Sequence, residues 1–94
     1  MFTISMDKNN EIKLTGRLDA SQVDKAKEVF SKVETSCVVN FTELEYISSA
    51  GLGVLLQAQK LLKDKGYDIK LINLNDHILD IFKWTGFDQL FEIT

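Results

Sequence analysis

The chain has 94 residues, of which 45% are hydrophobic and 27% charged, and this fits one small globular domain spanning residues 1–94. A net charge of −3 without a dense Lys/Arg cluster argues against nucleic-acid binding. The single cysteine, Cys37, excludes an internal disulfide and a cysteine-rich zinc site, so we expect neither metal nor cofactor. The N-terminus lacks a signal-peptide pattern and no apolar run reaches the roughly 20 residues of a membrane span, which predicts a cytoplasmic protein.

The first third of the chain predicts a hairpin followed by a helix. Residues 2–6 and 11–18 alternate between apolar and polar side chains on either side of a short polar turn, which favours an antiparallel pair of strands. Asp19 and Ser21 then offer side-chain oxygens that can cap a helix. Apolar residues at helical spacing predict that this helix covers residues 20–33.

The middle of the chain predicts a buried strand and a long helix. Residues 37–41 form a short, β-branched apolar run typical of a buried strand, and residues 42–46 are interpreted as a polar connection. A pair of serines then opens an apolar helical pattern over residues 48–65, and Gly66 is placed to end it.

The last third predicts a strand, a third helix and a final strand. Residues 67–74 form the strand, Asn75 or Asp76 caps the helix, and Gly86 stops it before a last strand within residues 87–93. The element order is therefore β-β-α-β-α-β-α-β. Strands that alternate with helices imply an α/β fold with a mixed, mostly parallel sheet and an antiparallel pair at one edge.

The serine pair at the start of the second helix is the most informative segment. The free N–H groups and the dipole of a helix's first turn favour negative charge, so a phosphate on Ser49 would be tolerated there. Gly51 and Gly53 each cost roughly 1 kcal/mol relative to Ala in a helix, which close approach of another backbone or of a partner protein would explain. The alternative interpretation is that both serines only cap the helix.

A helical wheel at about 100° per residue predicts which side of this helix faces the core. The core-facing arc contains Val54, Leu55, Ala58, Leu61 and Leu62. Outside that arc lie Ser49, Leu52, Gly53 and Leu56, whereas Ser48 is nearer the arc and is the better candidate for a plain cap. The residues outside the arc form either a partly apolar exposed patch, typical of a protein contact, or a surface covered by the third helix or a loop.

Three segments of the sequence resemble the STAS family of anti-sigma factor antagonists. They are Leu14-Thr-Gly-Arg-Leu-Asp19, Val38-Val-Asn-Phe41, and Ile47-Ser-Ser-Ala-Gly-Leu-Gly-Val-Leu-Leu56 with Leu44 before it. The resemblance covers nearly the whole chain and implies a single STAS domain. Members of the family commonly have a further C-terminal helix, which is missing here, so we expect an open surface that would allow a weak homodimer.

The resemblance implies partner switching controlled by phosphorylation. The unmodified protein would bind an anti-sigma factor that is also a serine kinase and would thereby release the sigma factor; the kinase would then phosphorylate it, and a PP2C-type phosphatase would reset it. By position in the motif the acceptor is Ser49, and Asp19 lies near it and helps to contact the kinase. Ser48, where the family often has Asp, is the alternative acceptor. The partner-binding surface implied is Asp19, Ser48, Ala50, Gly51, Leu52, Gly53 and Leu56.

Three other interpretations come from different classes of protein. An enzyme would need Ser49 as nucleophile and His77 as base, but the Gly-x-Ser-x-Gly elbow is absent, so we predict no catalysis. Nucleotide binding at the helix start has only a short Gly-x-Gly signal. A STAS module that is never phosphorylated would serve as a docking subunit of a transporter or a stress-signalling assembly. Trp84 in the third helix is predicted to anchor the core or an interface.

Overall fold

The computed structural model describes residues 1–94 as one five-stranded sheet with helices on one of its faces. The strands lie in chain order across the sheet: β1 (Phe2–Met6), β2 (Glu11–Leu18), β3 (Cys37–Ile47), β4 (Ile69–Ile72) and β5 (Glu92–Ile93). β1 is antiparallel to β2, and the other three pairings are parallel. The predicted α/β fold and element order are confirmed.

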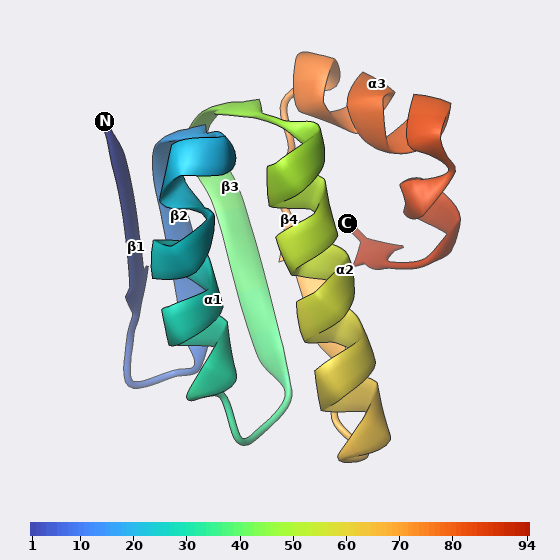
Figure 1. The fold of residues 1–94 in the computed structure, drawn as a ribbon. Helices are drawn as coiled ribbons and strands as arrows, with labels where there is room; N and C mark the ends of the chain where they lie inside the picture. The colour runs from blue at the N-terminus through green and yellow to red at the C-terminus, as the bar shows by residue number, and fades with distance from the viewer.

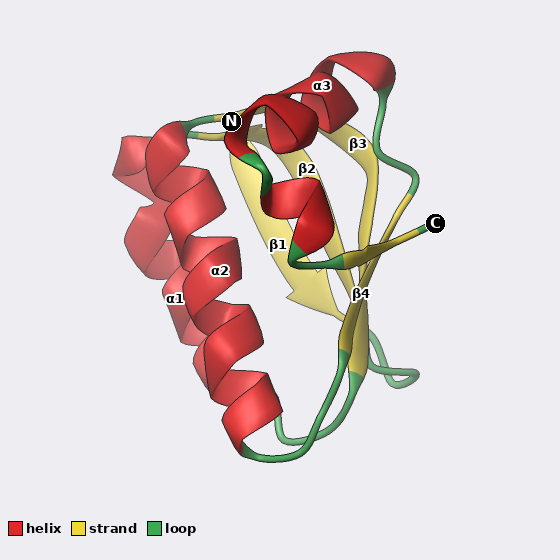
Figure 2. Ribbon diagram, turned by 90° about the vertical axis from the view of Figure 1, so that its right-hand side faces the viewer, coloured by secondary structure: helices red, strands yellow, loops and turns green.

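Three α-helices connect the strands: α1 (Val23–Ser31), α2 (Ser49–Asp64) and α3 (Asp76–Thr85). Two short 3-10 helices, η1 (Ala20–Gln22) and η2 (Phe87–Gln89), precede α1 and follow α3. α1 and α2 lie side by side on one face of the sheet, and α3 lies across the end at which the parallel strands finish (Figure 1, Figure 2). None of these helices combines the length and apolar character needed to cross a membrane.

The helix ends follow the predicted capping residues. The Asn75 side chain accepts a hydrogen bond of 2.9 Å from the backbone N–H of Ile78 and so caps α3. Gly66 after α2 and Gly86 after α3 have positive φ angles of 86° and 78°, the left-handed conformation that commonly ends a helix. The sequence signals for where α2 and α3 stop are therefore confirmed.

β3 is longer than the sequence pattern predicts. It runs over Cys37–Ile47 and includes residues 42–46, which the pattern assigned to a connection. The pairing with β2 shifts after Lys13 and again after Gly16, and each shift adds one residue to β3. Such bulges break the alternation of apolar and polar residues, so the strand loses its period-two signal where it continues.

Other boundaries also differ from the sequence prediction. The first helix begins with η1 and becomes α-helical only at Val23, and the predicted strand over residues 87–93 is reduced to the two residues of β5 after η2. Leu61, placed on the core arc of α2, is 52% exposed, and Trp84 is 78% exposed and therefore not a core residue. Both side chains belong to the surface.

The core lies between the sheet and the helices, and Phe82 of α3 packs it against the C-terminal part of the chain. Phe82 is fully buried and makes edge-to-face contacts with Phe41, Phe87 and Phe91 at centroid distances of 6.1, 6.5 and 5.9 Å. Cys37 is also buried, as predicted, and burial raises the pKa of its thiol to about 11. Aromatic packing therefore fixes α3 on the sheet.

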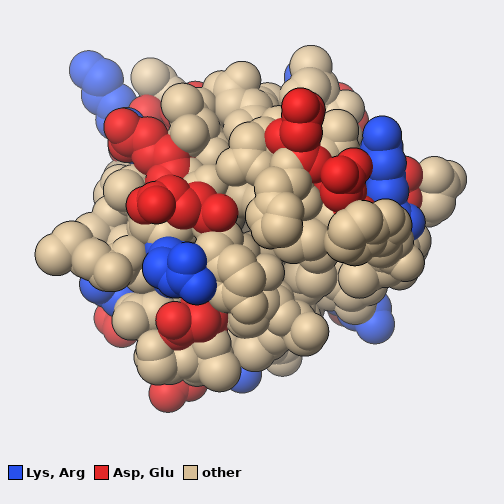
Figure 3. All heavy atoms as spheres, turned by 90° about the horizontal axis from the view of Figure 1, so that it is seen from above, with Lys and Arg blue, Asp and Glu red and all other residues tan.

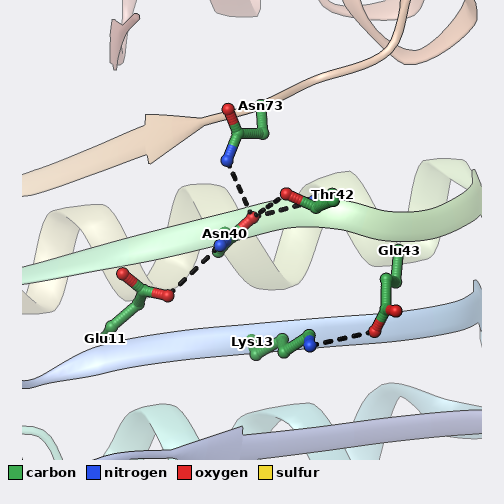
Figure 4. A network of polar contacts seen from close by, with 6 residues as sticks. All are labelled: Glu11, Lys13, Asn40, Thr42, Glu43 and Asn73. Atoms are coloured by element: carbon green, nitrogen blue, oxygen red, sulfur yellow. Dashed lines mark hydrogen bonds and ion pairs between the residues drawn. The ribbon is translucent and has the colours of Figure 1, made fainter.

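The opposite face of the sheet carries no helix and is polar (Figure 2, Figure 4). The Asn40 side chain in β3 donates to Glu11 at 3.2 Å and accepts from Asn73 at 3.2 Å. Lys13 forms a 3.0 Å ion pair with Glu43 across the two neighbouring strands. These cross-strand contacts explain how β3 can carry polar residues on this face of the sheet.

Candidate functional site

The serine pair lies where β3 passes into α2, at the end of the sheet where the parallel strands finish (Figure 1). Ser48 has an extended backbone, and its Oγ accepts a 3.1 Å hydrogen bond from the backbone N–H of Gly51. Ser48 is half-buried and is the N-cap of α2, as predicted. Its hydroxyl is therefore committed to the helix.

Ser49 has a different position although it is the next residue. It is the first residue of α2 and its side chain is exposed. The backbone N–H groups of Ser49 and Ala50 belong to the first turn, where a helix has no internal acceptors. An exposed hydroxyl thus stands beside free amide groups at the positive end of the helix dipole.

Asp19 is held close to the start of α2 by the chain on either side of it. The backbone N–H of Ser48 donates to the carbonyl of Leu18 at 2.9 Å, and Asp19 follows Leu18 directly. The Asp19 carboxylate accepts from the Ser21 hydroxyl at 2.6 Å and from the Ser21 backbone N–H at 3.0 Å. These hydrogen bonds, the one from the hydroxyl foremost, lower the pKa of Asp19 below its usual value, so a negative charge stands beside the helix start at neutral pH.

The two glycines in the first turns of α2 have different surroundings. Gly51 is buried, and a Cβ there would lie 2.8 Å from Leu18 Cγ, 2.9 Å from Ile47 Cγ1 and 3.0 Å from the Leu18 carbonyl oxygen. Gly53 is exposed, and a Cβ there would meet nothing within 4 Å. Close packing on β2 and β3 explains Gly51, whereas nothing within the chain requires Gly53. Leu18 and Ile47 lie in the segments that carry the family resemblance, but the sequence pattern did not predict that they pack against Gly51 and set how α2 begins.

Gly51→Ala is expected to destabilise the fold by about 1–3 kcal/mol, because the added methyl group overpacks against β2 and β3. The matched control Gly53→Ala is expected to leave stability unchanged or raise it by up to about 1 kcal/mol, since Ala favours helix and the position is open. Urea denaturation of the two variants measures both values. Equal stability of the two variants would show that the space around Gly51 accommodates a methyl group.

Leu52 is not part of the exposed patch that the helical wheel allowed. It is 4% exposed, and Leu56 is half-buried. Gln59, two turns further along the same side of α2, is 8% exposed and donates its amide to the Leu90 carbonyl, so the segment before β5 packs on this side. Covering by another part of the chain is therefore correct for Leu52 and in part for Leu56, whereas Ser49 and Gly53 stay exposed.

The exposed surface at the start of α2 is small and uncharged. It consists of Ser49, Ala50 and Gly53, with Leu56 at its half-buried edge. Figure 3 shows this end of the molecule, where acidic and basic side chains lie on both sides of a centre without charged groups. His77, the base of the enzyme interpretation, is exposed near the start of α3, and no hydrogen bond joins it to Ser49.

Comparison with known proteins relates this arrangement to one family. Residues 2–92 match the family model described as "Mlab, STAS domain". The anti-sigma-B factor antagonist of Listeria monocytogenes is 32% identical over 87 residues, which cover 88% of this chain and 76% of that protein. These values are sufficient to assign the family.

Solved structures show the same fold at lower sequence identity. A putative anti-sigma factor antagonist from Thermotoga maritima aligns with a TM-score of 0.81 at 18% identity, covering 98% of this chain and 84% of its own. The antagonist SpoIIAA aligns with TM-scores of 0.74 in its unphosphorylated form and 0.72 in its phosphorylated form, at 19% and 20% identity. Both alignments cover 100% of this chain, and 87% and 91% of those chains. The chain therefore belongs to the STAS-domain family of anti-sigma factor antagonists.

Proposed function

We propose that this protein is an anti-sigma factor antagonist that binds a serine-kinase anti-sigma factor through the start of α2 and is released when Ser49 is phosphorylated. The observation that carries the proposal is the division of roles between the two serines. Ser48 is half-buried and caps the helix, whereas Ser49 is exposed and makes no structural contact of that kind. A PP2C-type phosphatase would restore the hydroxyl and so reset the switch.

The chemistry of a phosphate at this position explains how one modification can end binding. Phosphorylation adds about 1.5–2 negative charges at neutral pH. In the free protein the first-turn amides of α2 tolerate that charge. In a complex the same charge must lie against a partner surface that fits a neutral hydroxyl and small neighbours, next to the carboxylate of Asp19. Repulsion and loss of hydration then favour release.

Two comparisons support the proposal. The relative from Listeria is named as an anti-sigma-B factor antagonist, and SpoIIAA, which has the same fold, is known in a phosphorylated form. Both fit a regulatory protein without a catalytic centre. The choice of Ser49 as the phosphorylated residue is based on its exposed side chain and on its position at the start of α2.

The test is phosphorylation by the kinase anti-sigma factor encoded in the same genome, followed by site mapping by mass spectrometry. We expect one phosphate on the wild-type protein, none on Ser49→Ala, and one on Ser48→Ala. The last variant loses the N-cap and is expected to be less stable by about 1 kcal/mol while remaining a substrate. Phosphate on Ser48, or no incorporation from any such kinase of that organism, would contradict the proposal and favour a docking subunit that is never phosphorylated.

A further inference from the structure

The most exposed aromatic side chain of the protein lies outside the site described above. Trp84 near the end of α3 is 78% exposed, whereas Ile78 and Phe82 of the same helix are fully buried. Trp84 follows Phe82 by two residues, or about 200° around the helix, so it points away from the core. Trp is enriched among the residues that anchor one protein on another.

Carboxylates lie on the same face of α3 as this tryptophan. Asp76, Asp80 and Trp84 follow one another at intervals of four residues, and all three are exposed. We refer to Asp76, Asp80 and Trp84 as the Trp84 surface. No ion pair within 4.0 Å joins either carboxylate to a cationic side chain. The exposed Lys83 lies on the same face of α3, which therefore carries two acidic groups and one basic group.

These properties indicate the chemistry of the group that would bind there. The face of a Trp ring attracts a guanidinium or ammonium group, and a carboxylate one helical turn away can pair with the same cation. A second copy of the chain is disfavoured, because a two-fold contact would place the carboxylates of two such surfaces against each other. A membrane is disfavoured, because anionic headgroups would be repelled. The surface fits an Arg or Lys side chain of a different protein.

The position of α3 relates this surface to the proposed function. The Asn75 side chain donates to the Leu44 carbonyl of β3 at 3.3 Å, which ties the start of α3 to the strand leading into the serine pair. α3 and the start of α2 therefore lie at the same end of the molecule (Figure 1). A protein contact of ordinary size covers about 800 Å² on each partner. The principal extents of the whole molecule are only 30 × 28 × 21 Å, so a contact of that size centred between α2 and α3 reaches both.

We propose that the Trp84 surface is a second contact for the anti-sigma factor and that it receives an Arg or Lys side chain of that partner. The inference rests on the proposed function, but the Trp84 surface and the start of α2 have different roles in it. The Trp84 surface supplies affinity in either state of Ser49, and Ser49 decides whether the complex can form fully. The partner would then be recognised on two helices.

The experiment uses the fact that Trp84 is the only tryptophan. The full chain is labelled with 5-fluorotryptophan and titrated with the unlabelled anti-sigma factor, and its single ¹⁹F resonance is followed. Calorimetry gives the dissociation constants of Trp84→Ala and Asp80→Asn. The matched controls are Leu61→Ala and Asp64→Asn, an exposed apolar and an exposed acidic residue near the far end of α2.

We expect the resonance to shift on binding, and Trp84→Ala to weaken binding at least about tenfold. Asp80→Asn should weaken binding less and should reduce its dependence on salt. The controls should stay within about twofold of the wild type. Circular dichroism should show unchanged folding of Trp84→Ala, because the side chain is exposed.

The outcomes separate this inference from the proposed function. If Ser49→Asp weakens binding while Trp84→Ala does not and the resonance stays in place, the second contact is refuted and the switch stands. If the wild-type protein binds no anti-sigma factor, both are refuted. A resonance that shifts with the concentration of the chain alone would assign the surface to self-association and overturn the partner named here.

Discussion

Ser49→Asp is expected to weaken binding to the anti-sigma factor by at least about 30-fold. Placing a charge in a contact that offers it no partner costs about 2–5 kcal/mol, and each 1.4 kcal/mol is a factor of ten in affinity. Ser49 is exposed, so the substitution should leave folding intact and act only on the complex. Isothermal titration calorimetry with the purified anti-sigma factor measures the effect.

The matched control places the same charge one residue earlier. Ser48 is the N-cap of α2, and Asp is an equally good cap, so Ser48→Asp keeps the helix and should change affinity much less than Ser49→Asp. Ser49→Ala should bind as tightly as the wild type and should not be released in the presence of ATP. Equal weakening by Ser48→Asp and Ser49→Asp would show that total charge at this end, and not residue 49, controls binding.

Phe82→Ala is expected to remove about 3–5 kcal/mol of stability, because truncating a fully buried aromatic residue leaves a cavity. Phe82 makes aromatic contacts with β3, with η2 and with the residue before β5, so its loss loosens α3 and the end of the chain together. Small domains are stable by only about 5–15 kcal/mol, so this variant should be partly unfolded near 37 °C. Guanidinium denaturation measures the change.

A second substitution in the same helix tests the reason given for this effect. Trp84→Ala removes a larger side chain than Phe82→Ala, but from an exposed position, and should change stability by no more than about 0.5 kcal/mol. A similar loss of stability in both variants would mean that Phe82 is not the buried contact between α3 and the sheet.

The order of the elements could be read from the sequence because the relevant signals are local. Alternation in β2, helical spacing in α2, the Asn75 cap and the glycines after α2 and α3 each depend on neighbouring residues, and all lie where predicted. The second half of β3 was missed because its bulges depend on pairing with a strand far away in the sequence.

The side of α2 that faces the core could be read only in part. A wheel assumes one covering surface, but the sheet and the segment before β5 both cover α2, and together they turn its buried side towards Leu52 and Gln59. On the other side α1 is only 9 residues long against 16 for α2, and Leu61 stays exposed. Long-range packing of this kind leaves no periodic signal in the helix itself.

The candidate site was easier to locate than its surroundings. The serine pair at a helix start followed from the sequence, and the wheel separated Ser48 as the cap from Ser49 as the free hydroxyl. Trp84 was named without a choice between core and interface. Its offset of two residues from Phe82 was the signal that could have made that choice, because two residues on a helix point to nearly opposite sides.

The arrangement of the strands in chain order also bears on how the protein is made. Each strand lies beside its predecessor, so during translation β1 to β4, with α1 and α2 over them, can come together before α3 has left the ribosome. The aromatic residues carried by the last part of the chain would join at the end. We therefore expect residues 1–72 to form a nearly complete but loosely packed sheet, which becomes rigid only when residues 73–94 pack against it.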